Sequence, residues 1–105
     1  MSKETKEIAN EIARQLGGFG RLKAMVNARE FGCGTSNGDS YLSFKFSMYP
    51  KANTCQIVYT VSDTYTVRFW KVTTKKRELV SEHEQIYADM LIELFESETG
   101  LDLSL

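Results

Sequence analysis

The 105-residue chain has little of several residue types and patterns that mark particular protein classes. It has two cysteines and one histidine, too few for a zinc site or a CxxC redox pair. No apolar stretch reaches the roughly 18 residues that a membrane span needs, and the N-terminal segment lacks the apolar run of a secretory signal. We therefore expect no membrane insertion, a cytoplasmic location and no cofactor. Cys33 and Cys55 are predicted to be free buried thiols, with a disulfide between strands as the alternative.

A catalytic signature is also missing. His83 is the only histidine, and Tyr87 stands where an HExxH metal-binding helix needs its second histidine. The stretch "GCGTSNGDS" lacks the Gly-Lys-Ser/Thr of a phosphate-binding loop and is predicted to be a flexible hairpin loop. We expect a non-enzymatic protein in which His83 is exposed at the start of a helix. An enzyme that uses His83 is the minor alternative.

Helical periodicity is present at the N-terminus. Residues 1–16 repeat apolar side chains at helical spacing, with Ser2 as the predicted N-cap and Gly17 and Gly18 as the end. A second short helix is predicted directly after this break, because residues 19–28 place their larger apolar side chains on one face: Phe19, Leu22, Met25 and Val26. Both apolar faces need a partner.

The period then changes to that of β-strands. In residues 41–48 the alternation predicts a core-facing set of Leu42, Phe44, Phe46 and Met48. Further strands are expected at 54–61 and 64–72, and the last segment, 75–81, is expected to form an edge strand. In strand 64–72 the side chains of Tyr65, Val67 and Phe69 share the core face. Trp70 and Arg68 therefore point to the opposite face, which Lys45 joins by the same parity.

A final helix is predicted over 82–99. Ser81 and Glu84 match a capping box, the following apolar positions form a broad stripe, and Gly100 suits the left-handed residue that ends a helix. The tail "LDLSL" is expected to fold back on the core. Together these elements predict one α+β domain over 1–105, an antiparallel sheet of about four to five strands with the N-terminal and C-terminal helices on one face.

Charge is distributed unevenly along the chain. Residues 40–80 hold seven Lys/Arg and two Asp/Glu, a balance of +5, whereas residues 81–105 hold no Lys/Arg and seven Asp/Glu, a balance of −7. Two candidate surfaces follow. One is the sheet face that bears Trp70, and the other is the acidic face of the last helix. The candidate partner-binding residues are Lys45, Arg68, Trp70, Lys75, Lys76 and Arg77 for the first, and Glu93 and Glu96 for the second.

These surfaces support two hypotheses. The first is an interaction protein that binds a protein partner through either surface. The second is a nucleic-acid-binding module, in which cations track phosphates and the Trp70 ring stacks on bases. A homodimer that pairs two open sheet faces would also bury Trp70.

Several segments carry a resemblance: "QLGG", "RLKAMVNAREF", "DTYTVRFWKV", "IYADML" and the terminal "TGLDLSL". Over residues 15–105 the chain resembles a group of small uncharacterised proteins encoded by bacteriophages and prophages. The resemblance implies a setting in the bacterial cytoplasm and stoichiometric binding to a host or phage protein, for instance inhibition of a defence factor. In that setting the acidic last helix would imitate nucleic acid. Cys33 and the "GCGTSNGDS" stretch do not belong to the pattern.

Overall fold

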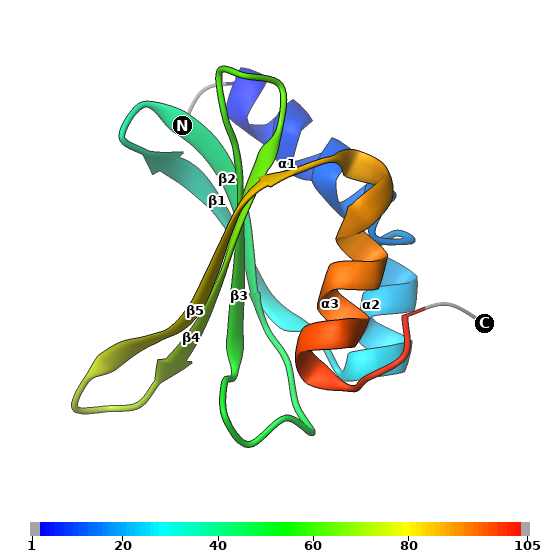
Figure 1. Ribbon diagram of the computed structural model, residues 1–105, viewed down its shortest axis with the longest axis vertical. Helices are drawn as coiled ribbons and strands as arrows, with labels where there is room; N and C mark the ends of the chain where they lie inside the picture. The colour runs from blue at the N-terminus through cyan, green and yellow to red at the C-terminus, as the bar shows by residue number, and fades with distance from the viewer. Residues whose placement is uncertain (1–2, 104–105) are drawn as a thin grey trace.

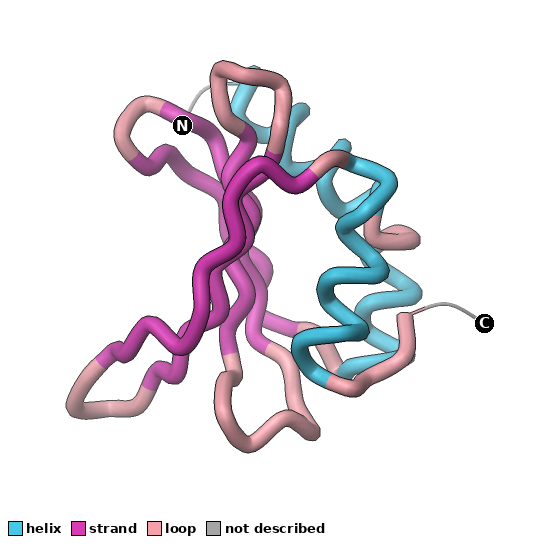
Figure 2. Tube along the Cα trace, in the orientation of Figure 1, coloured by secondary structure: helices cyan, strands magenta, loops and turns pink. Residues whose placement is uncertain are grey.

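The computed structural model describes residues 3–103, in which three α-helices and five strands form an α+β fold. The elements are α1 (Lys3–Gln15), α2 (Phe19–Val26), β1 (Arg29–Ser36), β2 (Asp39–Lys45), β3 (Thr54–Tyr59), β4 (Tyr65–Val72), β5 (Arg77–Ile86), the short 3-10 helix η1 (Ala88–Met90) and α3 (Leu91–Thr99). The strands form one antiparallel sheet in the order β1-β2-β3-β4-β5. All the helices lie on one side of this sheet, which confirms the predicted architecture (Figure 1 and Figure 2).

The N-terminal helices follow the predicted periodicity. Ile12 of α1 and Leu16 directly after that helix are fully buried, as are Leu22 and Val26 of α2. Gly17 and Gly18 end α1 with φ values of 103° and 94°, which only glycine adopts without strain. The predicted N-cap, Ser2, lies outside the described residues.

The hydrophobic core lies between the helices and the sheet, where β2 and β4 contribute the predicted inward side chains. The predicted inward residues of both strands are buried: Leu42, Phe44, Phe46, Tyr65, Val67 and Phe69. Four phenylalanines meet at its centre, where the ring centroids of Phe46 and Phe95 lie 5.2 Å apart. The prediction for Met48 was wrong, because β2 ends at Lys45 and the chain turns with φ 74° at Met48, which leaves that side chain 65% exposed.

The glycine-rich stretch is a strand and a tight turn, so the predicted flexible loop is corrected. Residues 29–36 pair with β2, and only Asn37 and Gly38 connect the two strands. Both have positive φ, 52° and 87°. An Asn-Gly pair favours such a two-residue hairpin turn, because both residues tolerate the left-handed region. The Asn37-Gly38 pair is the sequence signal for this turn.

The predicted helix over 82–99 was wrong in its first half. Residues 77–86 form β5 and pair with β4, and α3 begins only at Leu91. Ser81 is therefore a strand residue, and its hydroxyl donates to the Glu98 carboxylate instead of capping a helix. The predicted end of the helix is confirmed, since Gly100 adopts φ 74° and its N–H donates to the Glu96 carbonyl. Leu103 is fully buried, so the return of the tail is confirmed as far as this residue.

Candidate interaction surface

Among residues 3–103, no helix covers one face of the sheet. Figure 1 shows α1, α2 and α3 on one side, while the β1–β2 and β4–β5 turns project toward the other. We call this uncovered side the open face. Its central side chains, from β2, β3, β4 and the start of β5, line a shallow hollow of about 280 Å³: Tyr41, Ser43, Lys45, Thr54, Gln56, Trp70, Val72 and Arg77. The parity argument for Lys45 and Trp70 is thus confirmed.

Trp70 is half-buried at the centre of the open face. Its cross-strand neighbours are Thr54 on β3 and Leu79 on β5. The Arg77 guanidinium carbon lies 4.7 Å from the centroid of the indole ring, a cation–π arrangement. The indole Nε1 donates to Gln56 Oε1 at 3.4 Å. Arg77 therefore occupies part of the ring surface that a stacking base would need.

The cations predicted for this surface mostly have acidic neighbours. Lys45 Nζ lies 3.4 Å from Glu30, Arg68 Nε lies 2.5 Å from Glu82, and Lys76 Nζ lies 2.6 Å from Glu78. All three acids come from the edge strands of the sheet: Glu30 from β1, and Glu78 and Glu82 from β5. Glu78 already counts in the balance of +5 for residues 40–80, so Glu30 and Glu82 offset two of these five positive charges from other segments. Lys75, in the turn between β4 and β5, is exposed close to the Lys76–Glu78 pair.

Glu93 and Glu96 lie on α3, across the sheet from the open face (Figure 1). Glu93 is exposed. Glu96 Oε2 accepts a hydrogen bond from the backbone N–H of Leu103 at 2.7 Å, so this carboxylate holds the returning tail in place. The two candidate surfaces are thus separate, and of the acidic pair Glu93 is exposed whereas Glu96 is half-buried.

His83 is a strand residue and does not lie in the first turn of a helix, which corrects its predicted position. Its Nε2 lies 3.0 Å from Glu98 Oε1, and the Ser81 hydroxyl donates to the same oxygen at 3.0 Å. The Tyr49 hydroxyl donates to Glu98 Oε2 at 3.0 Å. In a catalytic triad the hydroxyl of the serine nucleophile is hydrogen-bonded to the imidazole of the histidine. Here the Ser81 hydroxyl and the His83 imidazole both contact the Glu98 carboxylate instead.

Glu98 was not among the predicted residues, although it organises this cluster. Burial would raise the pKa of its carboxyl group, but the hydrogen bonds from His83, Tyr49 and Ser81 outweigh that effect and lower the pKa. The cluster connects β5, the β2–β3 loop and α3. No sequence signal indicated it, because its members lie up to 49 residues apart.

The two cysteines lie in different surroundings. Cys55 is fully buried and burial raises the pKa of its thiol, while Cys33 is half-buried and no disulfide joins the two. Within residues 3–103, no group of three or more His, Cys, Asp or Glu side chains is arranged to hold a metal ion. In the same range, no helix has the length and apolar character to cross a membrane.

Comparisons with known protein families, with curated proteins and with solved structures find no match to this chain. The function is therefore inferred chiefly from the surfaces of this protein.

Proposed function

We propose that the protein is a non-enzymatic interaction module that binds a protein partner through the open face of its sheet. One observation carries the proposal. A hollow on a sheet face without helices presents Trp70 and Tyr41 together with Arg77 and Lys45. Tryptophan, tyrosine and arginine dominate the binding energy of protein interfaces, because they combine a large apolar area with polar groups.

The charge pattern of the open face favours a protein over a nucleic acid. Phosphate backbones require cations that are available to replace condensed counterions. Lys45 and Arg68 have acidic neighbours, and Arg77 lies over the Trp70 ring. A surface of alternating charges around an aromatic centre matches a polar rim around an apolar core. Lys75, Lys76 and Arg77, in and beside the β4–β5 turn, support nucleic-acid binding as the second candidate function.

The resemblance to phage and prophage proteins supports a host or phage protein in the bacterial cytoplasm as the partner. In this proposal the chain acts stoichiometrically, as an inhibitor of a host or defence factor. Two copies that pair their open faces are the homodimeric form of the same interface.

The test compares variants on the two separate surfaces. Tagged wild-type protein, Trp70→Ala and Arg77→Ala are used to capture partners from phage-infected bacterial lysate, with Glu93→Lys as the control on α3. We expect one partner that wild type and Glu93→Lys retain and that both open-face variants lose, because truncation of a central tryptophan costs about 2 kcal/mol or more. Circular dichroism of each variant shows whether the fold is intact.

Three other outcomes would assign the binding function differently. Loss of the partner with Glu93→Lys alone would assign binding to the acidic helix. Trp70 is the only tryptophan, so its emission also reports directly on the open face. Quenching by single-stranded DNA that salt reverses would favour the nucleic-acid function instead. A concentration-dependent dimer that Trp70→Ala dissociates would identify a second copy as the occupant.

A further inference from the structure

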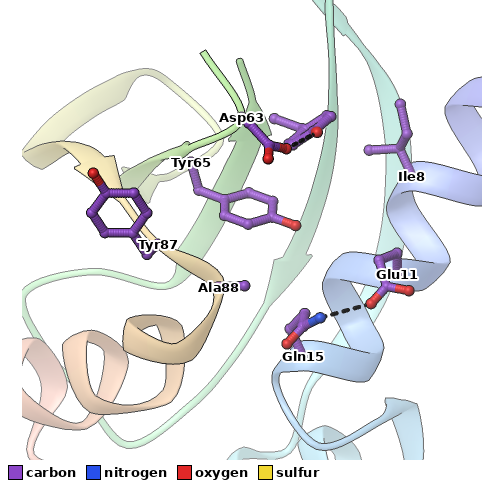
Figure 3. A pocket seen from close by; sticks show the side chains of 8 residues that line it. Ile8, Glu11, Gln15, Asp63, Tyr65, Tyr87 and Ala88 are labelled. Atoms are coloured by element: carbon purple, nitrogen blue, oxygen red, sulfur yellow. Dashed lines mark hydrogen bonds between the residues drawn. The ribbon is translucent and has the colours of Figure 1, made fainter. Parts of the chain in front are cut away.

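A second hollow lies on the helix side of the sheet. Figure 3 shows it between α1, the turn that joins β3 to β4, and the segment that leads from β5 into η1. Its volume is about 460 Å³, within the range of small-ligand sites. Three tyrosines line it, Tyr59, Tyr65 and Tyr87, together with the carboxylates of Glu11 and Asp63. No lysine or arginine of the described chain lines this cleft.

The hydroxyl of Tyr65 has no partner in this cleft. The residue is only 7% exposed, and its hydroxyl points into the hollow toward α1 (Figure 3). Among residues 3–103, no group forms a hydrogen bond with it. Within residues 3–103 every fully buried side-chain nitrogen or oxygen has a hydrogen-bond partner, so this unpaired oxygen is reached by solvent. It is therefore available to a ligand that enters the cleft.

Asp63 offers a second unused acceptor. Its Oδ1 accepts the hydroxyl proton of Tyr59, whereas no described residue donates to Oδ2. The residue is exposed in the turn between β3 and β4 and adopts φ 63°. The rings of Tyr59 and Tyr65 lie 5.4 Å apart between centroids and are tilted by 45°, so they form two adjacent walls.

Glu11 contributes charge and is already hydrogen-bonded. Arg14 Nη2 donates to its carboxylate at 2.6 Å and Gln15 Nε2 donates at 2.8 Å. The Arg14 side chain is 74% exposed and lies outside the lining of the cleft. Burial raises the pKa of Tyr65, and the carboxylates of Glu11 and Asp63 raise it further. Both negative charges therefore act on the same phenol.

We propose that this cleft binds an alkylammonium group, whose N–H groups donate to the Tyr65 hydroxyl oxygen and to Asp63 Oδ2 while the tyrosine rings surround its carbon chain. Acidic and aromatic walls together favour a cation, because a carboxylate attracts the charge and the ring faces stabilise it. An anionic ligand would meet two carboxylates. The cation is a free aliphatic amine or the side chain of a lysine in a peptide. The site is separate from the open face, so it does not depend on the function proposed above.

Binding is tested by calorimetry and by two-dimensional NMR on the full chain. The probes are putrescine, an end-blocked peptide with one lysine, and butanol as a neutral molecule of similar length. Asp63→Asn removes the charge but tolerates the left-handed backbone and still accepts the Tyr59 proton. Tyr65→Phe keeps the ring and removes only the hydroxyl. Glu93→Gln removes an exposed carboxylate elsewhere and is the matched control.

We expect saturable binding of putrescine, of the peptide or of both, with NMR shifts at the cleft residues. Asp63→Asn should weaken it about tenfold or more, as loss of a hydrogen bond between charged groups does. Tyr65→Phe should weaken it several-fold and leave the thermal midpoint unchanged, while Glu93→Gln should bind like wild type. Binding of the peptide alone identifies a protein source, and binding of putrescine alone identifies a free amine. Equal affinity for butanol, an unchanged dissociation constant in Asp63→Asn, or no saturable binding would each overturn the proposal.

Discussion

Glu98 is the residue whose replacement should destabilise this fold through polar contacts more than any other surface carboxylate. It receives hydrogen bonds from Tyr49, Ser81 and His83, each at 3.0 Å, and its side chain is 16% exposed. In Glu98→Ala all three donors lose their acceptor. Hydrogen bonds to a charged group contribute about 1.5–3 kcal/mol each when buried. We take about 1 kcal/mol for each here, because the cluster is partly open to water.

The expected cost of Glu98→Ala is thus about 3 kcal/mol in the free energy of unfolding. Glu98→Gln should cost about half as much, because its amide oxygen still accepts from one side. Urea unfolding followed by Trp70 emission and by far-ultraviolet circular dichroism measures both variants. Glu93→Ala and Glu93→Gln, on the same helix but exposed, are the matched controls and should change stability by less than about 0.5 kcal/mol.

The same cluster predicts a dependence on pH. The folded-state pKa of Glu98 is lowered from the ordinary value of 4.5. Its contribution is therefore fully present above that value and is lost as the pH falls through the lowered folded-state pKa, because the unfolded chain binds the proton first. The stability difference between wild type and Glu98→Gln should be constant near neutral pH and shrink in acid. A cost of Glu98→Ala equal to that of Glu93→Ala, or a difference that grows in acid, would refute this reasoning.

Two further predictions concern the glycines and the cysteines. Gly17→Ala should lower the free energy of unfolding in urea by about 1–2 kcal/mol, because residue 17 has φ 103° and the new Cβ would lie 2.5 Å from Arg21 Cδ. Gly20→Ala should raise it by about 0.5 kcal/mol, because no atom lies within 4 Å of the new Cβ and alanine favours a helix over glycine. A loss in Gly20→Ala as large as in Gly17→Ala would contradict the backbone argument. In a thiol-reagent assay at mildly alkaline pH, Cys33 should react in the native protein and Cys55 only after urea unfolds it, because Cys55 is fully buried and burial raises the pKa of its thiol. Labelling of Cys55 at the rate of Cys33 would show that the core opens without global unfolding.

Local patterns in the sequence were sufficient for much of the fold. Alternation predicted which side chains of β2 and β4 face the core, since successive strand residues point to opposite sides. The same rule placed Lys45 and Trp70 on the open face. The double glycine after α1 and Gly100 after α3 marked helix ends, because each adopts a positive φ that other residues resist.

Residues 82–86 show where local patterns failed, whereas the edge strand predicted over 75–81 is confirmed for residues 77–81. Ser81 and Glu84 fit a capping box, yet pairing with β4 holds this segment as a strand. The choice between helix and strand here depends on hydrogen bonds to a distant segment, and these tertiary contacts override local propensity.

The sequence by itself determined the α+β architecture, the two sides of the sheet and the position of its single tryptophan. Only the tertiary structure decided how the charges are paired, since Glu30 and Glu82 come from the two edges of the sheet to meet Lys45 and Arg68. It also decided the Glu98 cluster and the tyrosine cleft. Both depend on side chains brought together from segments far apart in the chain, and hydrophobic periodicity carries no information about which polar groups will meet.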